Sequence, residues 1–337
     1  MKEAMLYERI DEAKVRCALC AHRCLIGDGK RGICGLRENR DGTLYSLAFG
    51  KLIATNIDPV EKKPLFHFQP GSHTYSVASV GCNFRCAHCQ NYDISQYPHA
   101  HPDSPIPGRE TAPDEVVQAA LQSGCRSISY TYTEPTVWLE FCLDTARRAR
   151  EHGLKNIFVS NGYMTPESAR TIGPLLDGNN IDLKGDEKFY EHICKAHLGP
   201  VKDTITLMKE LGVWVEVTTL VIPGHNDSDR SLTDIAEFIR SVDPAMPWHV
   251  TRFSPTYKMT DRPPTPAGTL RRAVEIGQAR GLKYIYEGNI PGQGGEDTVC
   301  PNCGETIINR IGFNVISNRI KTGACPACST PQPGVWQ

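Results

Sequence analysis

The sequence lacks a strong net charge and lacks long apolar runs. Of its 337 residues, 37 are Lys or Arg and 38 are Asp or Glu, which gives a formal net charge of -1. This balance argues against a protein built mainly to bind nucleic acid. No apolar run is long enough to span a bilayer, and the N-terminal segment has no apolar stretch of the signal-peptide type. We therefore expect a cytoplasmic protein with no membrane partner.

Cysteine, in contrast, is abundant, with 14 residues in a chain that is 40% hydrophobic and can bury a sizeable core. A disulfide framework is not expected in a cytosolic chain of this length, so metal binding is the leading hypothesis. Eleven of the cysteines fall into three groups. Of the others, Cys125 and Cys142 sit in apolar segments and should pack as small buried side chains, and Cys194 has no partner nearby in sequence.

The C-terminal group consists of two CxxC pairs, Cys300 with Cys303 and Cys325 with Cys328. Each pair turns two thiolates toward one point, and four thiolates suit a tetrahedral zinc ion, with rubredoxin-like iron as the alternative. Residues 306–321 between the pairs alternate in polarity and predict a short hairpin. So small a unit buries little core, so a metal would supply its folding free energy. The spacing therefore predicts a zinc ribbon.

The N-terminal group, Cys17-x2-Cys20-x3-Cys24-x9-Cys34, is also spaced like a metal site. The turn-forming sequence GDGKRG separates its last two cysteines. The spacing does not match that of common ferredoxins. Zinc, an auxiliary iron–sulfur cluster and no metal at all stay open as interpretations, and His22 could replace one sulfur.

The middle group, Cys82-x3-Cys86-x2-Cys89, directly follows a β-branched, alternating run at 74–80 that predicts a strand. Three thiolates leave one position of a metal site open, which is what catalysis needs and a structural site avoids. A [4Fe–4S] cluster on three cysteines would keep one iron free for a substrate or cofactor. We therefore assign the chemistry to this group.

The rest of the middle region alternates between strand and helix patterns. Strands are predicted at 127–133, 156–160, 179–184, 214–222, 248–253 and 283–287, and amphipathic helices at 113–123, 137–152, 166–176, 201–211, 229–241 and 267–280. With the strand before the middle group, this makes about seven β/α units and a parallel sheet with helices outside. The predicted fold class is α/β, a partial (β/α)6-type TIM barrel.

Polar residues recur where these strands end. The segments are 133–135, 160–162, 182–184, 223–227 and 287–289. Each alone would be explained as a turn or a helix cap. Ligands bind at the carboxyl ends of parallel strands, so their recurrence after successive strands predicts a binding site.

The segment CNFRCAHC of the middle group resembles the CxxxCxxC motif of radical SAM enzymes. The resemblance implies a [4Fe–4S] cluster on Cys82, Cys86 and Cys89, whose open iron binds S-adenosylmethionine (SAM). One electron then splits the sulfonium into methionine and a 5′-deoxyadenosyl radical, which abstracts hydrogen from a substrate. His88 stands where the family usually has a larger aromatic residue near the adenine, and its ring can still stack.

Further SAM contacts follow from the same resemblance. Thr133 and Glu134 occupy the place of the family's GGE segment, which hydrogen-bonds the SAM amino group, without its two glycines. Asn161 looks like the ribose or carboxylate contact after the third strand. Asp182 and Lys184 resemble the DxK of glycyl-radical-enzyme activases, where a lysine near a carboxylate ligand is electrostatically favourable.

The whole chain also resembles one narrower group, the radical SAM enzyme of the AmmeMemoRadiSam system, often labelled as similar to pyruvate formate-lyase activases. This resemblance rests on residues 17–34, 58–68, 70–72, 81–84, 90–91, 248–253 and 286–292 and on the terminal CPNC, CPAC and PGVW. It implies Memo-like and Ammecr-like proteins as candidate partners. A reducing protein such as flavodoxin or ferredoxin is expected as well, and the resemblance supplies no substrate.

Two segments near the expected site allow two interpretations each. In residues 58–68, the charged residues 61–63 and His67 either line the site or belong to a structured linker. His249 and Arg252 on the sixth strand are expected to point into the barrel. There they either grip an anionic substrate group or form a satisfied core pair.

Three classes of function account for parts of these patterns. An iron–sulfur electron carrier explains the cysteines but not the large β/α core, and the neutral charge weakens a zinc-ribbon nucleic-acid module. A radical SAM enzyme explains both, with hydrogen abstraction from an unidentified substrate such as a protein or peptide, or installation of a glycyl radical on a partner enzyme. The predicted units are a Cys-rich N-terminal segment (1–66), a radical SAM core (67–290) and a zinc-ribbon-like unit (291–337).

Overall fold

The structure, a computed structural model, describes residues 1–290 and 294–337. Two sequence predictions include residues outside this range. They are the resemblance segment 286–292 and the unit boundary at residue 291. In the described part of the chain, none of the helices combines the length and the apolar character needed to cross a membrane.

One 8-stranded sheet forms the centre of the molecule. Its strands are β8 (Ala54–Pro59), β9 (His73–Ala78), β11 (Ser127–Tyr130), β12 (Lys155–Ser160), β13 (Gly178–Asp182), β14 (Trp214–Val221), β15 (Trp248–Arg252) and β16 (Ile285–Gly288). The order is β16-β15-β14-β13-β12-β11-β9-β8, and all pairs from β9 to β16 are parallel. β8 pairs antiparallel with β9, so β8 and β16 are the edges and the barrel stays open.

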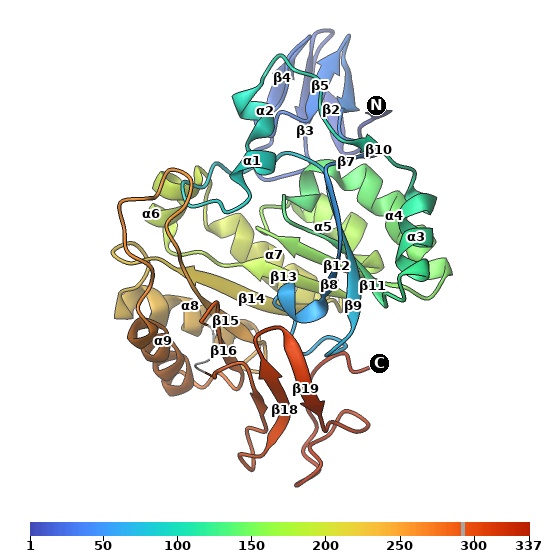
Figure 1. The fold of residues 1–337 in the computed structure, drawn as a ribbon. Coiled ribbons are helices and arrows are strands. Elements are labelled where there is room, and N and C mark those ends of the chain that lie inside the picture. The colour runs from blue at the N-terminus through green and yellow to red at the C-terminus, as the bar shows by residue number, and fades with distance from the viewer. Residues whose placement is uncertain (291–293) are drawn as a thin grey trace.

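Helices connect the parallel strands and lie on one side of the sheet (Figure 1). They are α3 (Pro113–Gln122), α4 (Leu139–Glu151), α5 (Pro166–Ile172), α7 (Gly199–Glu210), α8 (Asp229–Val242) and α9 (Ala267–Ala279). α8 shows why these segments are helical: Leu232, Ile235 and Ile239 recur at helical spacing and are buried, and the Ser228 hydroxyl caps its start by accepting from Ser231 N. The predicted α/β fold is confirmed.

One predicted strand end differs in a way that shapes the site. The strand expected at 127–133 ends at Tyr130. Tyr132 adopts a left-handed backbone conformation with φ of 63°, and Thr133 N donates to Thr131 O at 2.8 Å. This tight turn leaves the extended conformation early because a left-handed residue cannot continue a strand. It brings Thr133 and Glu134 over the carboxyl end of the sheet.

The N-terminal residues form small antiparallel sheets that the sequence did not predict. One contains β1 (Lys2–Glu3), β6 (Thr43–Ser46) and β5 (Arg37–Arg40), a second contains β2 (Tyr7–Arg9), β3 (Lys14–Cys17) and β4 (Leu25–Gly27), and β7 (Lys51–Leu52) pairs with β10 (Arg109–Glu110). They lie at the top of Figure 1, beside α1 (Tyr92–Ser95) and α2 (Tyr97–Ala100). A buried ion pair between Arg37 and Glu140 joins this region to α4.

The C-terminal residues form a separate 3-stranded antiparallel sheet of β17 (Thr298–Val299), β18 (Thr306–Ile311) and β19 (Asn314–Asn318). The hairpin predicted between the two CxxC pairs is therefore confirmed. This sheet lies below the central sheet in Figure 1, at the end opposite to the N-terminal sheets. Arg310 Nη2 donates to Phe66 O at 2.7 Å, which ties the hairpin to the segment that precedes β9.

Candidate functional site

A pocket of about 630 Å³ opens over the carboxyl ends of the parallel strands. This volume is in the range of about 300–1,000 Å³ that small-molecule sites occupy. The structure brings together in its lining every residue singled out for the middle group and for SAM: Cys82, Cys86, His88, Cys89, Thr133, Glu134, Asn161, Asp182 and Lys184. The polar residues that follow β11, β12, β13 and β16 thus line one pocket, whereas the predicted segment 223–227 after β14 lies outside its lining.

The thiols of the middle group are surrounded by hydrogen-bond donors. Cys82 Sγ accepts from Phe84 N at 3.3 Å and from Asn161 Nδ2 at 3.6 Å. Cys89 Sγ lies 3.2 Å from Ser95 Oγ. Donors of this kind stabilise thiolate sulfur, which is the form that binds a metal. The loop therefore presents three sulfurs that are suited to act as ligands.

A partly buried lysine lies next to these thiols. Lys184 Nζ pairs with Asp182 Oδ2 at 2.7 Å. Burial opposes its charge, but the charges of Asp182, Cys86 and Cys194 together hold the pKa of Lys184 well above its usual value. A hydrogen bond from Cys194 and the charge of Lys184 lower the pKa of the Cys86 thiol. Cys194 was missed as part of this site because a lone cysteine carries no spacing signal.

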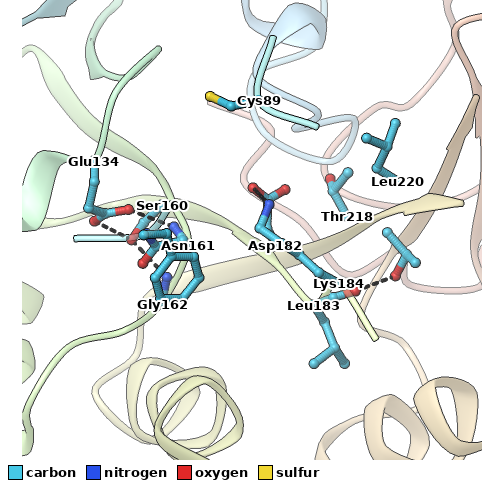
Figure 2. A network of polar contacts seen from close by, with 12 residues as sticks. Cys89, Glu134, Ser160, Asn161, Gly162, Asp182, Leu183, Lys184, Thr218 and Leu220 are labelled. Atoms are coloured by element: carbon cyan, nitrogen blue, oxygen red, sulfur yellow. Dashed lines mark hydrogen bonds and ion pairs between the residues drawn. The ribbon is translucent and has the colours of Figure 1, made fainter. Parts of the chain in front are cut away.

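The other wall of the pocket is a network around Glu134 (Figure 2). Its carboxylate accepts from Ser160 Oγ at 2.8 Å, from Asn161 N at 2.7 Å and from Thr136 N at 3.1 Å. Burial raises the pKa of Glu134, and these hydrogen bonds oppose that effect. In the described residues no lysine or arginine forms an ion pair with this carboxylate. A cationic group of a ligand is the partner that this wall lacks.

His88 is buried in the pocket lining and its ring centre lies 5.7 Å from that of Phe189. Burial, reinforced by the charges of Lys184 and His225, lowers its pKa to about 3. The ring is therefore neutral near pH 7. Its Nδ1 has no hydrogen-bond partner among the described residues. A flat, neutral ring of this kind is compatible with the predicted stacking role, which stays a prediction.

The expectation for His249 and Arg252 is only half correct. His249 lines the pocket and contacts Glu216 at 2.6 Å, but Arg252 is not part of the lining. Alternate residues of a strand face opposite sides, so a spacing of three places the two side chains apart, and Thr251 lines the pocket instead. The buried partner Glu216 was missed because a single glutamate inside an apolar strand carries no motif.

Residues 58–68 combine both interpretations offered from the sequence. Leu65 and Phe68 are fully buried and pack in the core. Lys63 is 2% exposed, pairs with Asp58 at 2.8 Å and also lines the pocket. The turn of the β18–β19 hairpin adds Phe313 to the same lining. No local sequence pattern predicted this contact.

The C-terminal group is arranged around a single point. The Sγ atoms of Cys300 and Cys328 are 3.7 Å apart, as are those of Cys303 and Cys325. All four ligand atoms lie within 4.8 Å of one another. Thiolates at about 2.3 Å from one tetrahedral ion are about 3.8 Å apart, so the spacing fits one zinc-sized ion. This arrangement confirms a zinc-ribbon-like unit.

The N-terminal group lies outside the pocket. Cys17, Cys20 and Cys34 are buried and Cys24 is partly exposed. His22, which could replace one sulfur as a ligand, directs its other ring nitrogen, Nε2, to Asn83 O at 2.8 Å. Its ring thereby joins this region to the loop of the middle group.

Comparison with known proteins identifies the family of this chain. Residues 76–238 match the radical SAM superfamily. Over 331 residues the chain is 49% identical to an uncharacterized protein from Methanocaldococcus jannaschii, and the match spans 97% of this chain and 98% of that protein. The chain belongs to the radical SAM superfamily. It is accordingly a radical SAM enzyme.

Two more distant matches show how far the likeness extends. The 7-carboxy-7-deazaguanine synthase from Thermococcus kodakarensis is 26% identical over 158 residues, which span 42% of this chain and 61% of that protein. A radical SAM methyltransferase from Sphaerobacter thermophilus has a similar structure, with a TM-score of 0.50 and 16% identity over 66% of this chain and 68% of that chain. The structural likeness shows a shared fold.

Membership of the radical SAM superfamily implies a [4Fe–4S] cluster and SAM, and the residues present fit both. Three thiols line one pocket, and hydrogen-bond donors reach the sulfurs of Cys82 and Cys89. The same pocket offers the Glu134 carboxylate for a cationic group and the Lys184 ammonium for an anionic one. These opposite charges match the amino and carboxylate groups of an amino acid.

Proposed function

We propose that Cys82, Cys86 and Cys89 hold a [4Fe–4S] cluster and that the enzyme cleaves SAM reductively in the pocket above the sheet. When bound, the cluster and SAM supply a 5′-deoxyadenosyl radical that takes hydrogen from a substrate C–H bond. The observation that carries the proposal is the convergence of the three thiols, Glu134 and Lys184 on one pocket of about 630 Å³.

The chain's own residues bind and orient SAM in this proposal. Glu134 accepts the ammonium group, because it is a buried carboxylate already aligned by hydrogen bonds from Ser160 and Asn161. Lys184, held by Asp182 at 2.7 Å, attracts the carboxylate group. The neutral His88 ring stacks near the adenine. Thr133 is held near these groups by donating from Oγ1 to Ser79 O at 2.6 Å.

We propose a protein or peptide as the substrate. The β18–β19 hairpin extends from the pocket lining at Phe313 and exposes Ile311 and Ile316, which are 64% and 57% exposed. Apolar side chains exposed beside a pocket are typical of surfaces that contact a macromolecule. The open barrel edges leave room for such a substrate. Memo-like and Ammecr-like proteins are candidate partners, and a flavodoxin or ferredoxin is the candidate reductant.

Installation of a glycyl radical on a partner enzyme is the second candidate. The Asp182–Lys184 pair favours it, because the two side chains contact each other in the pocket in the pattern that suggested an activase. Deuterium labelling separates the two candidates. An activase transfers deuterium to 5′-deoxyadenosine from a labelled glycine of its partner, whereas an enzyme with another substrate transfers deuterium from a different carbon.

The remaining assignments follow from the cysteines and the fold. We propose that the C-terminal group holds Zn²⁺ as a structural ion. We also propose that the chain is divided into a Cys-rich segment (1–66), a radical SAM core (67–290) and a zinc-ribbon-like unit (291–337). A cytoplasmic location is proposed because free thiols and iron–sulfur clusters persist in a reducing compartment.

The test is anaerobic reconstitution with iron and sulfide, reduction with dithionite, addition of SAM and measurement of 5′-deoxyadenosine. Cys86→Ala should reduce the product to background. Cys125→Ala is the matched control, because Cys125 is buried away from the pocket lining and should leave the product unchanged. Failure of the reconstituted protein to bind SAM would contradict the proposal.

A further inference from the structure

The N-terminal group plays no part in the function proposed above, yet the fold gathers it into one place. Cys17 N donates to Cys24 O at 2.9 Å, which closes the β3–β4 hairpin with Cys20 in its turn. The loop that carries Cys34 returns to the same point, since Ile33 N donates to Cys24 Sγ at 3.5 Å. The four cysteines of residues 17–34 thus lie in one hairpin and the loop packed beside it.

The spacing of the sulfur atoms distinguishes this group from the C-terminal group. The four C-terminal ligand atoms lie within 4.8 Å of one another, whereas no three sulfurs of the N-terminal group do so in the described part of the chain. The middle group, for which we propose a cluster, is likewise too widely spaced for this criterion. Two of the three cysteine groups therefore share an open spacing and one has the spacing of a single ion.

The N-terminal thiols are nevertheless neighbours. Cys17 and Cys24 are joined by a backbone hydrogen bond of 2.9 Å, and Ile33, which adjoins Cys34, donates to the Cys24 sulfur at 3.5 Å. Thiolates on one ion must approach one another closely, whereas thiolates on a cluster each bind a different iron and stand farther apart.

We propose that Cys17, Cys20, Cys24 and Cys34 hold a second iron–sulfur cluster of the [4Fe–4S] type. All four ligands are cysteines, so this cluster has no open iron and is a redox or structural centre instead of a second SAM site. His22 Nε2 is directed to Asn83 O at 2.8 Å, and we assign the four sulfurs alone as the ligands.

The surroundings of the sulfurs fit an anionic cluster. Arg37 Nη1 donates to Cys17 Sγ at 3.5 Å, and Ile33 N donates to Cys24 Sγ. Arg37 is 1% exposed, and its charge is balanced by Glu140 of α4. Hydrogen bonds to sulfur and local positive charge are the means by which proteins stabilise a cluster and set its potential.

The location of the second cluster gives it a role that rests on the proposed function. His22 contacts Asn83 next to Cys82, and Ala21 N donates to Tyr163 O at 3.2 Å in the segment that follows Asn161. The two cluster sites are therefore linked by direct contacts. In this role the N-terminal group would hold a cluster that accepts one electron from a flavodoxin or ferredoxin and donates it to the cluster held by Cys82, Cys86 and Cys89.

The decisive experiment removes the middle group and counts the metal that remains. The full chain with Cys82, Cys86 and Cys89 all changed to Ala is reconstituted anaerobically, and iron, sulfide and zinc are measured. We expect about four iron and about four sulfide per chain with cluster absorption, against about eight of each without these changes. Zinc instead of iron, or no metal beyond the C-terminal ion, would overturn the proposal.

A second variant assigns the iron to the N-terminal group. Adding Cys20→Ala and Cys34→Ala to the triple variant should remove the remaining iron, whereas adding Cys125→Ala should leave it. The triple variant keeps every N-terminal residue, so its iron and zinc counts test the second cluster even if the second variant folds poorly. Neither count depends on SAM cleavage, so failure of the proposed function is distinguished from failure of this proposal.

The electron-transfer role has its own measurement. Cys24→Ser in the otherwise unchanged enzyme should lower 5′-deoxyadenosine formation at least tenfold with reduced flavodoxin, while dithionite, which reaches both clusters, restores most of the rate. An equal loss with both reductants, or no loss with either, would refute the role.

Discussion

The C-terminal group and the middle group both consist of cysteines, but the two groups differ in the spacing of their sulfurs and in the core around them. In the C-terminal group, the sulfurs of Cys300 and Cys328 lie 3.7 Å apart, as do those of Cys303 and Cys325. Among the described residues, the fully buried apolar cluster beside them is limited to Cys300, Ile307 and Cys325. The middle group instead packs against the main core of the barrel and opens into a pocket. A unit with little core must close around its metal to fold, whereas a site on a folded barrel can leave a position open for chemistry.

The sharpest test of this comparison removes one ligand from each region. Cys325→Ser should unfold the C-terminal unit, because zinc binding supplies about 10–16 kcal/mol to units of this kind. Hydrogen exchange should then lose protection at residues 298–318 and keep it in the central sheet. Cys89→Ala should leave that protection intact and abolish 5′-deoxyadenosine formation. Protection retained in Cys325→Ser would show that the hairpin is stabilised by its contacts to the barrel alone.

The comparison also explains what could be predicted from the sequence. Cysteine spacing and strand–helix periodicity are local patterns, so the middle group, the hairpin and the parallel sheet could all be predicted. Phe313 lines the pocket, and Cys194 and Glu216 contact the lining residues Cys86 and His249, only through the packing of distant segments. No local sequence pattern predicts such contacts. Arg252 was misplaced because its spacing of three from His249 was treated as if it matched the strand period of two.

Lys184→Met tests whether the partly buried ammonium beside the thiols binds SAM. Loss of the ammonium should weaken SAM binding to the reconstituted enzyme by about 10–100-fold, the usual cost of removing a supporting group at a metal site. Asp182 would also lose its partner at 2.7 Å. Lys188→Met is the matched control, because Lys188 is exposed and outside the pocket lining. Equal SAM affinities, measured by equilibrium dialysis, would exclude Lys184 from the SAM site.

The junction between the two regions should respond to pH. His67 is fully buried, donates from Nδ1 to Pro333 O at 2.8 Å and lies 2.5 Å from Tyr286 Oη through Nε2. Burial lowers its pKa to about 4, against about 6.5 when unfolded. The unfolded chain therefore binds the proton first, and stability is lost as the pH falls from about 6.5 toward 4.

The size of this effect at pH 5 is about 2 kcal/mol relative to pH 7. Urea unfolding at the two pH values measures it, and His67→Gln should remove that part of the difference. His152→Gln, at an exposed position, should keep it. A pH response unchanged in His67→Gln would mean that other groups control the acid lability, including protonation of the cysteine ligands.

The smallest effect is expected where the C-terminal unit meets the pocket. Phe313 is 41% exposed and lines the pocket, so a macromolecular substrate identified by deuterium transfer should contact it. Phe313→Ala should raise KM about fivefold, or about 1 kcal/mol, and change kcat little, as for a moderate interface side chain. Ile311→Ala makes the same test for the exposed part of the hairpin outside the lining, and Leu121→Ala on α3 is the control for both hairpin variants. If both variants raise KM equally, the substrate binds along the whole hairpin, and the unit that looks purely structural also selects the substrate. If neither variant raises KM, the C-terminal unit contributes folding stability alone, and substrate binding belongs to the barrel.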